Sequence, residues 1–192
     1  MIPSTFDYVR VQTVKEAIDK LNELNGDGKL IAGGQSLIPL LKFRLSEPTS
    51  LVDIRHISEL KDICIVGNRL VVGALATHAE VTKDATVNEY VPVLAETCEQ
   101  IADIQIRNVG TIGGNIAHAD PAADLPATAT ALDAIITYED ENGEESVPLE
   151  DFVLGPLITT LPPTGIVKTV SFEIPPSHAK GIYLKNPHPA SG

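Results

Sequence analysis

The sequence predicts an α+β fold with two lobes, a small parallel α/β lobe followed by a mainly antiparallel α+β lobe. In the first 55 residues, apolar strand-like segments alternate with helical patterns, which is typical of parallel sheets. After residue 55, two turn signals between β-rich segments favour antiparallel pairing. We therefore expect lobes over 1–55 and 56–177, followed by a terminal segment over 178–192.

The first lobe begins with a helix, because Thr13-Val-Lys-Glu16 forms a capping box ahead of apolar residues at helical spacing. The Asn25-Gly-Asp-Gly28 segment ends that helix, and Pro48 breaks the chain before the next strand. The expected elements are, in order, a helix over 14–24, a strand over 29–32, a tight loop over 33–36, a short helix over 37–43 and a strand over 51–54.

The second lobe has a hairpin signal at Gly67-Asn-Arg69, between apolar segments, and a turn at Asn142-Gly143 within the acidic run 139–145. A second capping box, Thr77-His-Ala-Glu80, predicts another helix start. The expected elements are strands over 63–66, 70–73, 134–138 and 166–174, with helices over 91–102 and 122–132.

Composition and charge exclude several classes of function. The 14 Lys and Arg against 26 Asp and Glu give a net charge of −12, the wrong sign for electrostatic nucleic-acid binding. No apolar run approaches the ~20 residues that span a bilayer, and the first ten residues carry no apolar leader, so we expect a cytoplasmic protein without a membrane span. Two cysteines, Cys64 and Cys98, are too few for a four-ligand metal site, and we expect both in the core and no bound metal.

Two glycine-rich turns, over 32–36 and 110–115, are the most informative features. Glycine permits positive φ and a close approach of the backbone to a ligand, and successive N–H groups can then bind an anion. No Lys or Arg occurs from Asn108 to Val167, so an anion held there needs backbone dipoles and neutral donors such as Thr111 and Asn115. The alternative is that the glycines only permit tight turns. Neither a G-x-G-x-x-G nor a P-loop pattern is present.

The segments around both turns carry a family resemblance. Residues 29–44 (KLIAGGQSLIPLLKFR), 51–54 (LVDI) and 105–126 (QIRNVGTIGGNIAHADPAADLP) resemble the flavoprotein subunits of the molybdenum hydroxylases. These are the medium chains of carbon monoxide dehydrogenase and the FAD-binding part of xanthine dehydrogenase. The resemblance implies the two-lobed FAD-binding domain of the vanillyl-alcohol oxidase type, with FAD as cofactor.

In that family, FAD passes electrons between a partner's iron–sulfur clusters and an external acceptor, so the resemblance implies an oxidoreductase subunit. Its partners would be an iron–sulfur small subunit and a molybdenum-cofactor large subunit, and no residue here is expected to be catalytic. The resemblance implies these cofactor-binding residues: Leu30, Ile31, Ala32, Gly33, Gly34, Gln35, Ser36, Leu37, Ile101, Thr111, Gly113, Gly114, Asn115, Asp124 and Lys185.

Family chains continue into a C-terminal domain that this sequence lacks, so 178–192 is interpreted as an end strand, Gly181–Lys185, and the truncated start of that domain. Two other functions stay open: an FAD-free fragment that acts only as a folded binding module, and a self-contained flavin oxidase. Asp124 could bind the cofactor or cap the following helix. Arg107 could support the second turn or pair with acidic side chains.

Overall fold

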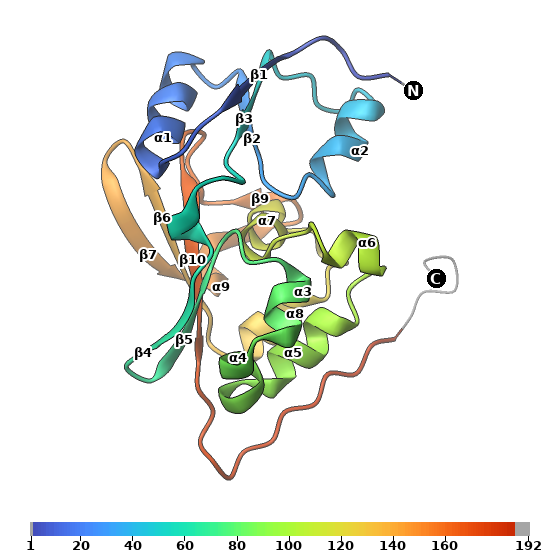
Figure 1. The fold of residues 1–192 in the computed structure, drawn as a ribbon, viewed down its shortest axis with the longest axis vertical. Coiled ribbons are helices and arrows are strands. Elements are labelled where there is room, and N and C mark those ends of the chain that lie inside the picture. Colours follow the sequence, from blue (N-terminus) through green and yellow to red (C-terminus); the bar gives the residue numbers. More distant parts are fainter. Residues whose placement is uncertain (1, 187–192) are drawn as a thin grey trace.

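The computed structural model describes residues 2–186 (Figure 1). Its helices are α1 (Val14–Glu23), α2 (Leu37–Lys42), α3 (His78–Lys83), α4 (Ala85–Tyr90), α5 (Pro92–Glu99), α6 (Ile104–Arg107), α7 (Ile112–His118), α8 (Leu125–Ala131) and α9 (Leu149–Phe152), with a 3₁₀ turn, η1 (Ser58–Leu60). Its strands are β1 (Asp7–Arg10), β2 (Gly28–Ile31), β3 (Ser50–Asp53), β4 (Ile63–Val66), β5 (Arg69–Gly73), β6 (Ile135–Asp140), β7 (Gly143–Pro148), β8 (Val153–Gly155), β9 (Ile158–Thr159) and β10 (Ile166–Glu173).

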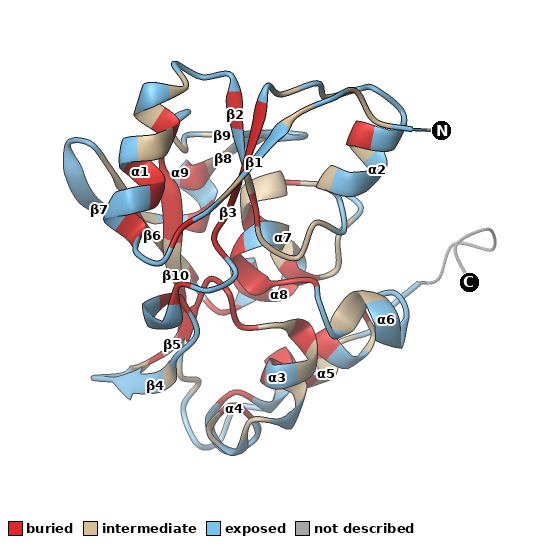
Figure 2. Cartoon of the chain, turned by 45° about the horizontal axis from the view of Figure 1, so that its top comes forward, coloured by how far each residue is buried: buried red, intermediate tan, exposed pale blue. Residues whose placement is uncertain are grey.

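A three-stranded parallel sheet of order β1-β3-β2 forms the first part of the chain. Helix α1 covers it with the residues that the sequence pattern selects, Val14, Ala17, Ile18 and Leu21. These positions recur at helical spacing and form the red stripe of α1 in Figure 2. Thr13 caps the helix by accepting a hydrogen bond from the N–H of Glu16, as the capping box predicts.

A five-stranded antiparallel sheet of order β4-β5-β10-β6-β7 forms the second part, with the long strand β10 at its centre. Its core joins the sheet to the helices α3, α4, α5, α7, α8 and α9, and the fully buried Phe152 and Phe172 are among its largest side chains. Helix α7 contacts both β5 and β10. The predicted order, a parallel lobe followed by a mainly antiparallel one, is confirmed.

Several boundaries and elements differ from the prediction. The helices expected over 91–102 and 122–132 are shorter, since they span Pro92–Glu99 and Leu125–Ala131. Sequence periodicity missed strand β1, the short elements α4, α6, α9, β8 and β9, and the helical state of residues 112–118. These elements are seven residues long or shorter, too short for a periodic pattern to emerge.

Two predictions are wrong. Gly181–Lys185 forms no strand, because its backbone pairs with no strand of the described part of the chain. Cys64 is exposed although Cys98 is buried, since Cys64 lies on β4, an edge strand with three of its four residues exposed.

The boundary between lobes at residue 55 stays a prediction. Ile57, Leu60, Leu75 and Ile166 lie beyond it, yet their side chains pack into the core of the first sheet. Within residues 2–186, no helix has both the length and the apolar character needed to cross a membrane.

Candidate functional site

The loop that joins β2 to α2 presents a row of free backbone donors. From Gly33 to Leu37, no N–H group has an acceptor among the described residues. Gly34 has a φ of +70°, as expected for a glycine that turns the chain sharply. The side chain of Gln35 folds back and donates from Nε2 to the Gly33 carbonyl at 3.1 Å, which braces the loop. Successive N–H groups of this kind can bind an anion without a formal positive charge.

The second glycine-rich segment is the start of helix α7, not a turn. Thr111 is its N-cap and accepts a hydrogen bond from the N–H of Gly114 at 3.2 Å. The next N–H groups also have acceptors within the chain: Ile112 donates to Ala76 O, Gly113 to Ala74 O and Asn115 to Thr111 O.

The expectation of free N–H groups in both segments is therefore wrong for the second. Gly113 and Gly114 also lack the positive φ that the turn prediction required. Gly113 is instead needed for packing, because a Cβ there would lie 2.4 Å from the Cβ of Ala74. What this segment can offer a ligand is the hydroxyl hydrogen of Thr111, whose oxygen accepts from Gly114, and the side chain of Asn115.

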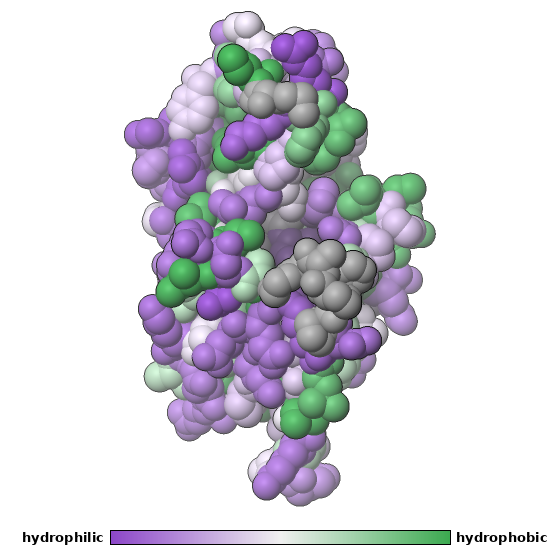
Figure 3. All heavy atoms as spheres, turned by 90° about the vertical axis from the view of Figure 1, so that its right-hand side faces the viewer, coloured by the Kyte–Doolittle hydropathy of each residue, from purple (hydrophilic) through white to green (hydrophobic). Residues whose placement is uncertain are grey.

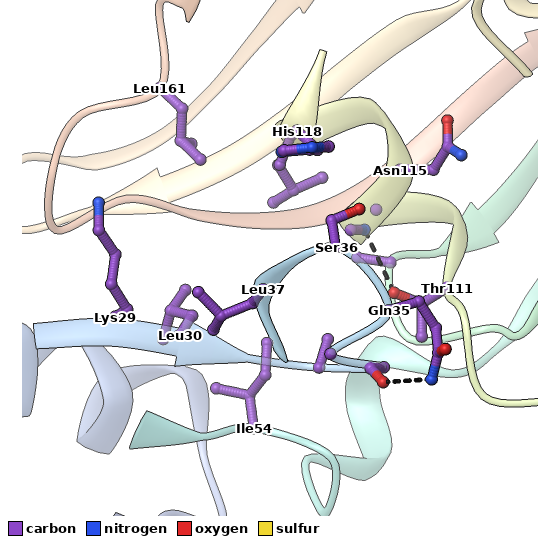
Figure 4. Close-up of a pocket in the computed structure, with 18 of the residues that line it drawn as sticks. Lys29, Leu30, Gln35, Ser36, Leu37, Ile54, Thr111, Asn115, His118 and Leu161 are labelled. Atoms are coloured by element: carbon purple, nitrogen blue, oxygen red, sulfur yellow. Dashed lines mark hydrogen bonds between the residues drawn. The ribbon is translucent and has the colours of Figure 1, made fainter. Parts of the chain in front are cut away.

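The two segments lie against each other. A Cβ built on Gly33 would stand 2.2 Å from the carbonyl oxygen of Val109 and 2.9 Å from Cα of Gly110. A β-bridge between Thr77 and Thr111 holds the second segment to the start of α3. Figure 4 shows Ser36 and Leu37 approaching from the first sheet, and Thr111, Asn115 and His118 from the opposite wall.

Between these walls lies a cavity of about 690 Å³. Figure 3 looks onto the side of the molecule that carries α2 and α6, where the surface is hollowed between its upper and lower halves. The cavity volume falls within the ~300–1,000 Å³ typical of small-molecule sites. The predicted site residues that line it are Leu30, Ala32, Gly33, Gly34, Gln35, Ser36, Leu37, Ile101, Thr111, Gly113, Gly114 and Asn115.

Three predicted residues do not line the cavity. Ile31 is buried in a small core with Leu41 and Leu51. Asp124 and Lys185 pair with each other, Lys185 Nζ lying 2.9 Å from Asp124 Oδ2. Asp124 makes no side-chain cap to α8, so the capping alternative is wrong.

The cavity lining lacks the negative charge that dominates the rest of the chain. No Asp or Glu is among the described residues that line the cavity, although the chain carries a net charge of −12. Lys29 is the one Lys or Arg among them, and its side chain lies at the rim in Figure 4. Asn115 Oδ1, a hydrogen-bond acceptor, is buried without a partner among the described residues, so it can accept from a hydroxyl or amide group of a ligand. The cavity thus suits an anionic ligand with apolar parts.

Sequence reasoning missed the third wall of the cavity. It comes from the segment between α9 and β10 together with the first residue of β10, and its lining residues are Leu157, Thr159, Leu161, Pro162, Pro163, Gly165 and Ile166. Figure 4 shows Leu161 facing Leu30 and Leu37 across the cavity. No glycine-rich turn or charged motif marks this segment, and only the return of β10 to the centre of the sheet brings it here.

His78 is a buried histidine in the wall near Gly110. Burial, with a contribution from the positive charge of Arg107, lowers its pKa to about 4, so the ring is neutral at physiological pH. Its Nδ1 lies 4.0 Å from Cys98 Sγ. Arg107 supports the site through the backbone, since its Nη1 donates to the carbonyls of Ile101 and Ala102 at 2.9 and 2.8 Å.

Comparison with known proteins identifies the family. Residues 4–176 match the family described as the FAD binding domain in molybdopterin dehydrogenase. The chain belongs to this family. Of the relatives of this FAD-binding domain, the alpha subunit of the 6-hydroxypseudooxynicotine dehydrogenase complex of Paenarthrobacter nicotinovorans is 42% identical over 171 residues, covering 89% of this chain and 58% of that protein.

The medium chain of carbon monoxide dehydrogenase of Hydrogenophaga pseudoflava is also 42% identical, over 84% of this chain and 56% of that protein. A solved structure of carbon monoxide dehydrogenase from the same organism superposes with a TM-score of 0.90 at 39% identity, covering 92% of this chain and 62% of that one. This FAD-binding domain thus spans less than two thirds of these relatives.

The residues of the cavity fit FAD, the cofactor of this family. A dinucleotide carries a diphosphate between two ring systems. The free N–H groups over 33–37 suit the diphosphate, and apolar residues such as Leu30, Leu161 and Ile101 suit flat rings. The absence of carboxylates from the described lining removes the repulsion that an acidic chain would otherwise exert.

Proposed function

We propose that the chain binds FAD in this cavity and acts as the electron-transfer flavoprotein part of a molybdenum hydroxylase. The observation that carries the proposal is the row of free N–H groups from Gly33 to Leu37, facing Thr111 and Asn115 in a cavity whose described lining has no carboxylate. The diphosphate would lie at this loop, with the Thr111 hydroxyl and the Asn115 amide as neutral donors.

The roles of the other residues follow from their places in the wall. Leu30, Leu37 and Leu161 would exclude water from one end, and Ile101 and Ile106 from another part of the lining. Asp124 and Lys185 do not line the cavity, and their proposed role is to support the cofactor site from beside Gln100, the residue that precedes Ile101. When bound, FAD exchanges electrons singly or in pairs, which side chains cannot do, while the protein binds and orients it.

The partners proposed are an iron–sulfur small subunit and a molybdenum-cofactor large subunit, with the complex in the cytoplasm. The medium chain and alpha subunit to which this chain is similar are named as parts of larger dehydrogenases. The described residues contain no group of three or more His, Cys, Asp or Glu that could hold a metal, so the iron–sulfur clusters and the molybdenum cofactor of the proposed complex are assigned to the partner subunits.

The decisive experiment is a titration of the purified chain with FAD, followed by its visible spectrum. We expect binding near one FAD per chain and quenching of flavin fluorescence. A colourless protein that cannot be reconstituted would instead favour the FAD-free binding module.

Copurification from cells tests the partners. An iron–sulfur protein retained with the chain supports the electron-transfer role. A flavin-containing chain that oxidises a substrate alone would favour a self-contained oxidase.

A further inference from the structure

The segment Gly181–Lys185, the strap, runs in extended form along the outside of the core of the five-stranded sheet. Figure 1 shows the chain after β10 in red, first turning at the bottom of the molecule and then rising beside α5. Gly181 lies close to Val93, since a Cβ on Gly181 would be 3.1 Å from the Val93 Cβ. The N–H of Tyr183 donates to Glu96 Oε2 at 3.2 Å.

Side chains of the strap alternate between two faces. Tyr183 and Lys185 face the protein, whereas Ile182 and Leu184 are 70% and 80% exposed. The side chains on the inner face, Tyr183 and Lys185, both contact the carboxylate of Asp124.

Both carboxylate oxygens of Asp124 are held by the strap. The Tyr183 hydroxyl donates to Oδ1, and Lys185 Nζ donates to Oδ2 at 2.9 Å. Lys185 Nζ also donates to the carbonyl of Gln100 at 2.7 Å. The Asp124 side chain is 15% exposed, so these contacts are partly shielded from water.

This cluster stands directly behind the cavity wall. Gln100 precedes Ile101, which lines the cavity, and the charge of Asp124 acts on His78, another lining residue. A displacement of the Asp124 side chain would therefore change both the position of Lys185 and the electrostatic field at this wall of the cavity.

We propose that Tyr183 is a positioning residue of the cofactor site, which fixes the Asp124 carboxylate and through it the Lys185 ammonium beside Ile101. The inference rests on the proposed binding of FAD in this cavity. A phenol that donates a hydrogen bond to a carboxylate restricts the rotation of the carboxylate. Such charge-assisted hydrogen bonds are stronger than bonds between neutral groups. Burial and the hydrogen bond to Asp124 raise the pKa of Tyr183 to about 12, so the phenol stays a donor throughout the physiological range.

The test compares Tyr183→Phe with Tyr90→Phe, which removes a hydroxyl from a tyrosine that is 41% exposed and has no side-chain hydrogen bond among the described residues. We expect Tyr183→Phe to raise the Kd for FAD about tenfold, because the Asp124 carboxylate and the Lys185 ammonium are then no longer fixed beside the site. Tyr90→Phe should leave the Kd within about twofold, and the thermal midpoints of both variants are measured in parallel.

A double-mutant cycle shows whether Tyr183 acts through Asp124. In the Asp124→Asn background, Tyr183→Phe should have little further effect on the Kd, and ultraviolet titration should show a lower phenol pKa for Tyr183. Equal effects of the two Tyr→Phe variants, or additive effects in the cycle, would overturn the inference. If the unmutated chain fails to bind FAD, the proposed function fails first, while the phenol titration still reports the Tyr183–Asp124 contact.

Discussion

Gly33 lies so close to Val109 that a single added carbon would stand 2.2 Å from the Val109 carbonyl oxygen. The two residues are far apart in the sequence, since Gly33 follows β2 of the three-stranded sheet and Val109 lies just before α7. Their contact brings the loop with free N–H groups against the start of α7, and it closes one side of the cavity. The site therefore depends on a close approach of two backbone segments that no residue other than glycine permits at position 33.

Gly33→Ala should weaken both the fold and FAD binding. Its Cβ would meet backbone atoms, which cannot rotate away, so we expect a loss of ~1–3 kcal/mol in unfolding free energy, as for other overpacked sites. FAD affinity should fall at least tenfold, because the loop must move away from Val109. Gly155→Ala is the matched control, since a Cβ at Gly155 meets no atom within 4 Å. Equal behaviour of the two variants in urea unfolding and FAD titration would contradict this account.

Thr111 has two separable roles, as N-cap of α7 and as a hydroxyl donor to the ligand. Thr111→Val removes both and should cost ~1 kcal/mol of stability together with a weaker FAD affinity. Thr111→Ser retains the hydroxyl and should preserve both properties. Chemical denaturation and FAD titration of the pair check this, and a Ser variant as damaged as the Val variant would show that the methyl group matters instead.

Lys29 should contribute little to FAD affinity. It is the one Lys or Arg among the described lining residues, and it is exposed, where a cation is screened by salt. Lys29→Met is expected to raise the Kd less than about threefold at physiological ionic strength. The measurement is an FAD titration at low and high salt. A large loss that disappears at high salt would mean that a side-chain charge, not the backbone of 33–37, holds the diphosphate.

His78 makes the stability of the fold depend on pH. Burial lowers its pKa to about 4 from the ordinary histidine value of 6.5. Between pH 4 and 6.5 the histidine is therefore protonated in the unfolded chain but neutral in the folded chain. The contribution of His78 to stability should thus be fully present above pH 6.5 and fall as the pH drops towards 4, by roughly 3–4 kcal/mol at about 1.4 kcal/mol per pKa unit. His78→Gln should flatten the curve in this window. Urea unfolding at several pH values tests this, and an unchanged slope in the variant would exclude His78 as the cause.

Much of the fold could be predicted from local patterns. Helix α1 has its cap at Thr13 and its apolar residues at helical spacing, so nothing distant is needed to specify it. Turns at Gly67 and Gly143 have positive φ, as hairpin glycines require, and the strands beside them pair as expected. The segment over 110–115 was harder, because its glycines resemble a turn. Thr111 could have indicated a helix start, but Gly113 and Gly114 disfavour a helix in isolation.

The sequence by itself determined the order of the two lobes, the family, and the two glycine-rich segments that face the cavity. Only the tertiary structure decided which segment keeps its N–H groups free, because that depends on the carbonyls of Ala74 and Ala76, which reach α7 but not the loop over 33–37. It also decided that Leu161 forms a wall and that Tyr183 and Lys185 meet at Asp124. Such contacts join residues distant along the chain, and local periodicity carries no information about where distant segments meet.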